Sequence, residues 1–288
     1  MDTRVTVTVF PGRSGRDLSR PLETAFGVFA DLERQFSLFR TGSEISAVNA
    51  AAGRPTTVSK RFAEVLGYAL ELAAETGGVF DPLVGRLTAP GADAQAAPPG
   101  SGFRDVRMDP DESILSMPAG SVLDLNSVVK GLALDLALEA FGGDEAVMIE
   151  AGGDIILKGL PPGKAAWDIG IRDPFEPRRL IAVIPAVAGA VCTSGDYFRT
   201  EAARAAGRGH LVNGRNGLTA GDIVSMTVLA PTARQADALS TAAYFLPPDQ
   251  AADFVEHHER CACFFIDGSG QVLAGAKMRS ILTAKTYA

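Results

Sequence analysis

The apolar residues of this chain recur at helical spacing in four places. They predict one helix over residues 21–38, a second that follows Ser59 and ends at "TGG", and a third over "VVKGLALDLALEAF", which a Gly-Gly pair stops. A fourth helix is predicted to begin at Ala233, because Thr232 and Gln235 fit a capping box, with a hydroxyl before the first turn and a glutamine three residues later.

Strand-like segments lie between these helices. The first ten residues alternate between apolar and polar side chains, and short apolar segments occur at 121–125, 146–159, 180–191, 223–230 and 261–267. The segment 146–159 contains a Gly-Gly turn and therefore predicts two strands. This mixture predicts an α+β protein in which helices cover sheet in two or more layers. The Pro/Gly/Ala stretch over 90–102 has no period, so it is a predicted loop and a candidate internal boundary.

Composition restricts the possible partners. The chain has 288 residues, of which 47% are hydrophobic and 21% charged, as in an ordinary soluble protein. The net charge of −7 and the lack of a Lys/Arg-rich run disfavour binding to nucleic acid or to an anionic membrane. No apolar run approaches the roughly 18 residues of a membrane span. The first residues lack the apolar core of a signal peptide, so we expect a cytoplasmic protein, or alternatively a periplasmic one whose leader has been removed.

The predicted fourth helix carries two polar residues in mostly apolar surroundings. Asp237 and Thr241 are four residues apart and therefore project from one face of the helix. Both offer hard oxygen ligands, which suit Mg²⁺ better than zinc. A strand leads directly into this helix, and α/β proteins commonly bind ligands at such corners. The alternative is an exposed aspartate and a threonine bonded to its own backbone, and the helix pattern leaves both interpretations open.

The segment "LDLNSVVKGLALD" is a second candidate. Asp124 closes a predicted strand, Ser127 occupies a position like that of an N-cap, and Lys130 lies in the first turn of the third helix. The helix dipole disfavours a cation at this end. A bound phosphate would reverse that effect, because backbone amides and the lysine would converge on it. The alternative is a lysine that faces solvent.

Motifs of several other classes are absent or incomplete. The glycine turns in "AGGDI" and "TSGDY" fit either a close approach to a nucleotide or a hairpin, but neither is a G-x-G-x-x-G motif. "GLPPGKA" lacks the spacing and the hydroxyl of a Walker loop, so a Rossmann domain and a P-loop NTPase are disfavoured. "HHERCAC" lacks the second ligand pair of a zinc site. No G-x-S-x-G motif supports a hydrolase.

Eight short segments, read in order, resemble the motifs of the FAD:protein FMN transferase family (ApbE). The family patterns include M-G-T, S-E-[IL]-S, T-x-G-x-F-D-P, D-L-G-[GA]-[IV]-A-K-G, T-S-G-D-Y and A-D-A-L-S-T-A. The matching segments are Met1-Asp-Thr, "SLFRTGSEISAVN" (37–49), "TGGVFDP" (76–82), "DLNSVVKG" (124–131), "AGGD" (151–154), "TSGDY" (193–197), "HLVNGRNG" (210–217) and "ADALSTA" (236–242). Because all eight occur in the order of the family, we interpret the match as common descent.

The resemblance implies both a fold and an activity. The implied fold is a single ApbE-like domain over residues 1–288, with two lobes and FAD in the cleft between them. The implied reaction is the Mg²⁺-dependent transfer of FMN from FAD to a Thr or Ser hydroxyl of an acceptor flavoprotein or redox subunit, with release of AMP. Some members of the family instead hydrolyse FAD to FMN and AMP.

The resemblance also implies roles for individual residues. The metal ligands of the family match Asp237, Thr241 and Ser127, the last through its backbone carbonyl. His210 matches a histidine near the reacting phosphate, so Asp237 and His210 are the expected catalytic residues. The positions that contact FAD match Met1, Phe39, Val79, Phe80, Asp81, Asp124, Lys130 and Leu211.

The chain departs from the family patterns in three places. Phe39 replaces a tyrosine that is expected to stack on the flavin, so the aromatic face remains and the hydroxyl is lost. Asn126-Ser127 replaces a smaller Gly-Gly or Gly-Ala pair. Asn213-Gly214 stands where Asp-Pro is usual, which removes a carboxylate beside His210. Two alternatives to FMN transfer therefore stay open: an FAD pyrophosphatase, and an FAD-binding protein with impaired catalysis.

Overall fold

A computed structural model of the chain describes residues 3–13, 15–89, 102–109, 111–176, 178–195, 211–217 and 221–282. The helices are α1 (Ser19–Phe36), α2 (Glu44–Ala50), α3 (Lys60–Glu75), α4 (Gly85–Thr88), η1 (Phe103–Asp105), α5 (Asn126–Leu138), α7 (Ala233–Tyr244), α8 (Pro248–His257) and α9 (Ala276–Ile281). The strands are β1 (Val5–Phe10), β2 (Thr56–Thr57), β3 (Arg107–Asp109), β4 (Ile114–Ser116), β5 (Ala146–Ala151), β6 (Asp154–Lys158), β7 (Trp167–Arg172), β8 (Leu180–Ala186), β9 (Gly189–Gly195), β10 (Ile223–Ala230), β11 (Ala262–Asp267) and β12 (Val272–Ala274).

The larger sheet has the strand order β1-β5-β6-β9-β10-β11-β12, and neighbouring strands are antiparallel throughout. β5 and β6 form a hairpin over Gly152 and Gly153, whose φ angles of 62° and 95° suit glycine. A smaller sheet has the order β2-β4-β3, and β7 pairs with β8. Antiparallel pairing with separate helices confirms the predicted α+β class.

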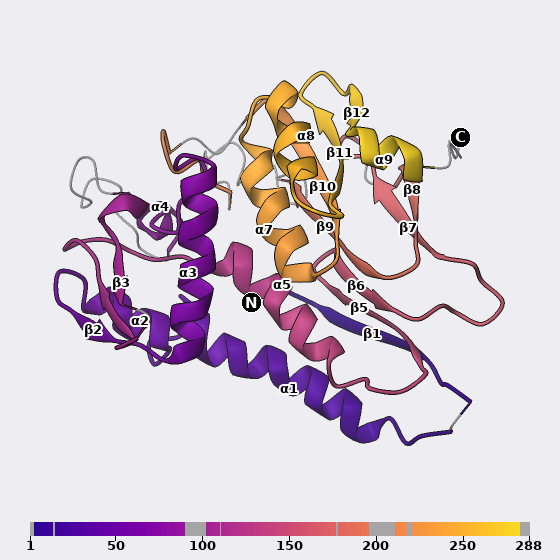
Figure 1. Cartoon of the computed structure of the whole chain (residues 1–288), viewed down its shortest axis with the longest axis horizontal. Helices are drawn as coiled ribbons and strands as arrows, with labels where there is room; N and C mark the ends of the chain where they lie inside the picture. The colour runs from indigo at the N-terminus through magenta and orange to yellow at the C-terminus, as the bar shows by residue number, and fades with distance from the viewer. Residues whose placement is uncertain are drawn as a thin grey trace.

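Both faces of the larger sheet are covered. In β11, Cys263 and Phe265 belong to the main core, whereas Phe264 and Ile266 belong to a second core. This division follows from the alternation of side chains along a strand. Figure 1 shows α5, α7 and α8 on the main-core side of this sheet and the β7–β8 hairpin with α9 at its other side. Because both faces of β11 are buried, its sequence is an unbroken apolar run.

Helices α2 to α4 and the three-stranded sheet form a second region, at the left of Figure 1, and α1 runs from it beneath α5. The main core runs through both regions, because it contains Phe62 and Leu66 of α3 together with Leu239 of α7. The long helix α1 packs against α5 and so ties the two regions together. The division into two lobes with an FAD cleft stays a prediction. Among the described residues, no helix combines the length and the apolar character that crossing a membrane requires.

Most of the predicted helices form where the sequence places them. Ser59 caps α3 by accepting a hydrogen bond from Phe62 N at 3.2 Å, and Thr232 caps α7 by accepting one from Gln235 N at 3.2 Å. Each cap supplies an acceptor to a helix N-terminal amide that has no partner within the helix.

Three predictions of local structure are wrong. Residues 121–125 form no strand, since their backbone makes only an isolated bridge between Val122 and Val84. Ser127 is the second residue of α5 and not its N-cap, because Leu125 holds that position and no side chain caps the helix. The first part of "TSGDY" is no turn: residues 193–195 end strand β9, while 196 and 197 lie outside the described residues.

Candidate active site

The N-terminus of α7 is held against α5 by a carboxylate. Asp135 of α5 accepts hydrogen bonds from the backbone amides of Ala233, at 2.7 Å, and Arg234, at 2.9 Å. The pKa of Asp135 is raised, because the effect of burial exceeds the opposing effect of the two amide donors. The amides at this helix end need acceptors, so Asp135 fixes where α7 begins relative to α5.

Gly131 allows the backbones of α5 and α7 to approach closely. A side chain here would place Cβ against the Ala233 carbonyl oxygen and 2.7 Å from Arg234 Cα, distances that real Cβ atoms do not adopt. The close approach lets the Gly131 amide donate to Asp237 Oδ2 at 2.9 Å. The glycine that ends "DLNSVVKG" therefore has a structural reason: it brings the carboxylate of α7 to the backbone of α5.

Lys130 lies between two buried carboxylates. Its Nζ is 2.5 Å from Asp154 Oδ2 and 3.5 Å from Asp237 Oδ1. Asp154 and Asp237 are 1% and 3% exposed, whereas the Lys130 side chain keeps 29% of its surface. Asp154 Oδ1 also accepts from Thr193 N at 2.9 Å. The solvent-facing alternative for Lys130 is therefore wrong.

This cluster of Lys130, Asp154 and Asp237 contains two acidic groups and one basic group. Burial alone would lower the pKa of Lys130, but the two carboxylates outweigh burial and raise it well above its usual value. Burial raises the pKa of Asp237 to about 7, against the opposing effects of Lys130 and the Gly131 amide. When all three side chains are ionised, the cluster carries a net charge of −1 away from bulk water.

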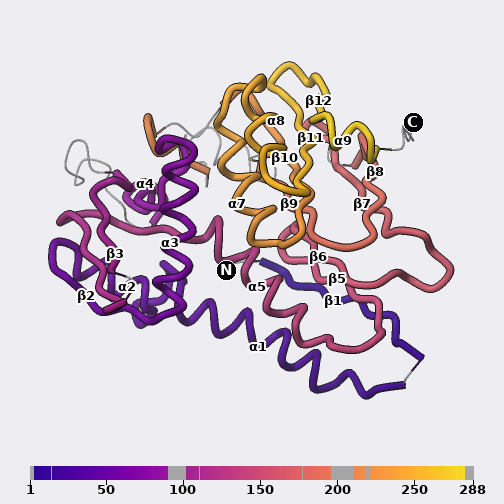
Figure 2. The backbone as a smooth tube through the Cα atoms, viewed as in Figure 1, coloured from indigo at the N-terminus to yellow at the C-terminus, as the bar shows by residue number. Residues whose placement is uncertain are grey.

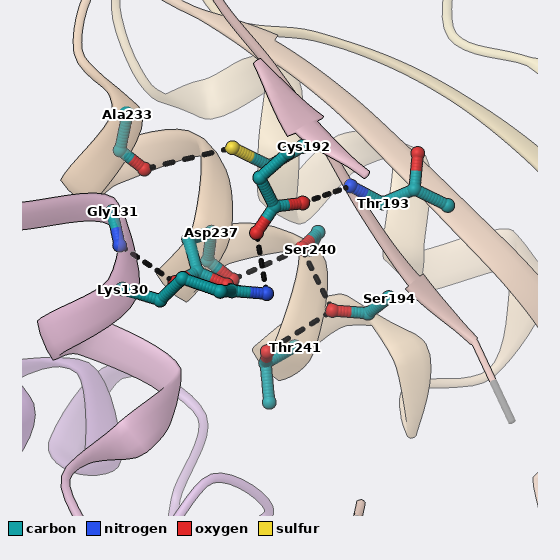
Figure 3. A network of polar contacts seen from close by, with 10 residues as sticks. Lys130, Gly131, Cys192, Thr193, Ser194, Ala233, Asp237, Ser240 and Thr241 are labelled. Atoms are coloured by element: carbon teal, nitrogen blue, oxygen red, sulfur yellow. Dashed lines mark hydrogen bonds and ion pairs between the residues drawn. The ribbon is translucent and has the colours of Figure 1, made fainter. Parts of the chain in front are cut away.

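A row of hydroxyl groups continues from this cluster. Ser194 Oγ lies 2.8 Å from Ser240 Oγ and 3.0 Å from Thr241 Oγ1, and Ser240 Oγ donates to the Asp237 carbonyl oxygen at 3.0 Å. Figure 3 shows these side chains from α7 and β9 pointing toward one another beside Lys130. Asp237 and Thr241, predicted on one helix face, both belong to this network. Asp237 is buried, so the alternative of an exposed aspartate is wrong, and the hydroxyl of Thr241 meets Ser194.

The residues present fit a hard divalent cation. In a regular helix the amide of residue 131 points at the carbonyl of residue 127, and here that amide also reaches Asp237 Oδ2. Carboxylate, hydroxyl and backbone carbonyl oxygens are the ligands that Mg²⁺ accepts, with water or substrate oxygens filling its other positions. A dication would also offset the negative charge of the cluster and favour the ionised form of Asp237. In the part of the chain that the structure describes, no three His, Cys, Asp or Glu side chains form a metal cluster.

A second group of predicted residues gathers where three segments meet. Gly214 N donates to Val79 O at 2.8 Å, and Asp124 N donates to Pro82 O at 2.8 Å. Figure 2 shows the short segment 211–217 beside α4, apart from the strands that follow it. The turn with Val79, Phe80 and Asp81, the start of α5 and the segment 211–217 are therefore neighbours.

Several of these residues have clear structural tasks. Asp81 Oδ1 accepts from Leu83 N at 2.8 Å and its Oδ2 accepts from Phe103 N at 3.0 Å, which ties the turn to η1. Burial raises the pKa of Asp81. Asp124 Oδ2 accepts from Thr88 Oγ1 at 2.6 Å. Such roles do not exclude contact with a ligand.

Not every predicted residue joins these groups. Phe39 lies in the turn between α1 and α2 and is 74% exposed, so its ring is outside the core. Leu211 begins the segment 211–217 of the second group, but its side chain is 6% exposed and belongs to the main core. Met1 and His210 lie outside the described residues.

The site contains residues that the sequence assigned to no role. Asp154 stands in the "AGGD" motif and Ser194 in "TSGDY", while Ser240 lies between two predicted ligands. Asn49, the last residue of "SLFRTGSEISAVN", holds Leu123 by two hydrogen bonds, of 2.8 and 3.0 Å. All four residues lie in the motifs, which marks them as candidates. A motif does not show which side chains contact one another in the fold.

Comparisons with known proteins find relatives along most of the chain and solved structures of the same fold. A FAD:protein FMN transferase of Treponema pallidum is 26% identical over 305 residues, covering 95% of this chain and 84% of the relative. A crystal structure of an ApbE protein from Thermotoga maritima superposes with a TM-score of 0.82 at 24% identity, covering 97% of this chain and 96% of that one. The flavin transferase ApbE of Vibrio cholerae gives a TM-score of 0.79 at 24% identity, with 97% and 100% covered. The sequence model of the ApbE family matches residues 1–265, and the chain belongs to that family.

Proposed function

We propose that this protein transfers FMN from FAD to a Thr or Ser hydroxyl of an acceptor protein. In this reaction the hydroxyl oxygen bonds to the phosphorus of the FMN half, the bond from that phosphorus to the bridging oxygen breaks, and AMP leaves with that oxygen. The observation that carries the proposal is the buried cluster of Lys130, Asp154 and Asp237 beside the Thr241 hydroxyl. Relatives named FAD:protein FMN transferase, which match most of the chain, support it.

The cluster has the chemistry to hold the pyrophosphate of FAD. Asp237, Thr241 and the Ser127 carbonyl are the proposed ligands of Mg²⁺, which when bound would neutralise charge on the pyrophosphate. Lys130 supplies a second positive charge, and Asp154 orients it by their 2.5 Å contact. His210 is the proposed acceptor of the hydroxyl proton, on the basis of the resemblance.

The segments that meet around the turn 79–81 are the proposed site for the rest of FAD. Val79, Phe80, Asp81, Asp124 and Leu211 are the proposed contacts there, together with Met1. The exposed ring of Phe39 is the proposed stacking surface for the flavin, since an aromatic face needs access to its partner. We further propose that residues 1–288 act as one domain, which the continuous main core supports.

An assay with three readouts tests the function. The protein is incubated with FAD, Mg²⁺ and a candidate acceptor protein, and both products are followed by mass spectrometry and chromatography. An acceptor that gains the mass of FMN supports transfer. Free FMN with AMP indicates a pyrophosphatase, and unchanged FAD indicates a binding protein.

Asp237→Asn tests the metal site with a matched change of one side chain. It keeps the shape of the side chain and an acceptor for the Gly131 amide, but removes the anionic ligand. A hard cation with few protein ligands depends strongly on its one carboxylate. We expect turnover to fall by orders of magnitude and to recover in part with excess Mg²⁺ or Mn²⁺. Parent-like turnover at limiting Mg²⁺ would show that the metal site is misassigned.

A further inference from the structure

Ser194 and Ser240 form a chain of hydroxyl groups that ends on Thr241. Ser194 and Ser240 are 6% and 0% exposed, and Thr241 is 9% exposed, so water does not freely compete for their hydrogen bonds. The chain runs from the Asp237 carbonyl oxygen through Ser240 and Ser194 to Thr241, with steps of 3.0, 2.8 and 3.0 Å. Figure 3 shows the last two steps side by side.

The direction of this chain follows from counting protons. A carbonyl oxygen only accepts, so the single hydroxyl proton of Ser240 is used on Asp237 O. Ser240 can then only accept from Ser194, and this step uses the proton of Ser194. Ser194 can in turn only accept from Thr241. The proton of Thr241 therefore points at Ser194, and its lone pairs point elsewhere.

We propose that Ser194 and Ser240 are positioning residues that preset Thr241 as a metal ligand, by holding its proton away from the cation. This inference rests on the proposed function, because it takes Thr241 as a ligand. A hydroxyl binds a cation through oxygen lone pairs, so a proton directed at the ion would oppose binding. The buried chain fixes the favourable orientation before the ion arrives.

Ser240 has no hydrogen bond to Thr241 in this chain, yet its hydroxyl determines the direction in which Ser194 and Thr241 donate. Without the Ser240 hydroxyl, Ser194 is free to donate to Thr241, and the proton of Thr241 is released toward the cation. A purely structural tie between β9 and α7 through Ser194 would be insensitive to that reversal. Ser240→Ala thus separates the two explanations.

The matched control is Thr227→Val, which keeps the volume of a buried side chain. Thr227 Oγ1 lies 2.9 Å from Thr193 Oγ1, and the two residues face each other across β10 and β9. Since neighbouring residues of a strand point to opposite faces, this hydroxyl pair lies on the other side of β9 from Ser194. Thr227→Val removes one buried hydroxyl and its hydrogen bond to Thr193 without touching the chain to Thr241.

The test measures Mn²⁺ binding directly, from the electron paramagnetic resonance signal of the free ion, with and without ADP as a pyrophosphate probe. A hydrogen bond of ordinary strength predicts a loss of affinity of roughly three- to tenfold for Ser194→Ala and for Ser240→Ala. Thr227→Val should bind like the parent. Thermal melts confirm that each variant is folded, and Ser240→Ala carries the test if Ser194→Ala does not fold.

Two results would overturn the inference in different ways. Parent-like Mn²⁺ affinity in both serine variants, with a loss in Asp237→Asn, would refute the positioning role and leave the metal site standing. Equal Mn²⁺ affinity in the parent and Asp237→Asn would remove the metal site itself, and the inference would fall with the proposed function.

Discussion

Gly131 offers the sharpest test of how the site is built. In Gly131→Ala the new Cβ would lie 2.6 Å from the Ala233 carbonyl carbon and 2.7 Å from Arg234 Cα, so the backbone of α7 must move. Overpacking of this kind costs about 1–3 kcal/mol, whereas alanine in place of glycine favours a helix by about 1 kcal/mol. The two effects oppose each other, so we expect the free energy of unfolding to fall by up to about 2 kcal/mol. The Gly131 amide would also move away from Asp237, and Mn²⁺ affinity should fall with it.

Urea unfolding followed by the fluorescence of Trp167 measures this effect, because Trp167 is the one tryptophan and is buried. Gly67→Ala in α3 is the matched control, since a Cβ there meets nothing within 4 Å. It should raise the free energy of unfolding by up to about 1 kcal/mol. A Gly131→Ala protein as stable as the parent, with the same affinity for Mn²⁺, would refute the close-packing argument.

Four further predictions follow from single contacts. Lys130→Ala leaves two buried carboxylates without their cation, so FAD affinity should fall roughly ten- to a hundredfold in a titration, and the free energy of unfolding by about 3 kcal/mol. Asp135→Ala removes the acceptor of two α7 amides and should lower the unfolding free energy by about 1–2 kcal/mol in urea. Gly214→Pro restores the residue usual in the family, yet it should weaken FAD binding. Proline cannot donate to Val79 O, and its Cβ would lie 2.6 Å from Gly78 O. Unchanged FAD affinity would contradict this prediction. Burial raises the pKa of Cys261 to about 11 and of Cys263 to about 12, and that of Cys192 well above its usual value, so thiol labelling at neutral pH should proceed only as the protein unfolds.

The sequence predicted those features that depend on a few neighbouring residues. The start of α7 at Ala233 follows from the hydroxyl of Thr232, and the hairpin of β5 and β6 follows from two glycines that tolerate positive φ. The same local logic failed at 121–125, where a short apolar segment predicts a strand. There the segment passes beside Val84 and pairs at one position only, because its polar groups bond to loops and to Asn49 instead.

Partners that lie far apart in the chain could not be predicted from spacing. Lys130 and Asp154 meet because α5 packs beside β6, and Ser194 reaches Thr241 because β9 lies under α7. A helix pattern states that Asp237 and Thr241 share a face but not what that face meets. Burial also excluded one of the two interpretations of Lys130: a lysine near a helix start is ordinarily exposed, and two carboxylates keep this one charged inside the protein.

The exchange of Asp-Pro for Asn213-Gly214 has to be interpreted with its surroundings. Asn213 Oδ1 accepts from Arg215 N at 2.9 Å, and Arg215 Nε donates to Gly77 O at 2.9 Å. Together with the bond from Gly214 N to Val79 O, these contacts fasten the segment to the turn that carries the predicted FAD residues. A proline would remove one of these bonds and has no room for its ring. These hydrogen bonds therefore explain the glycine at position 214, whereas the assay with FAD must test the carboxylate that Asn213 lacks.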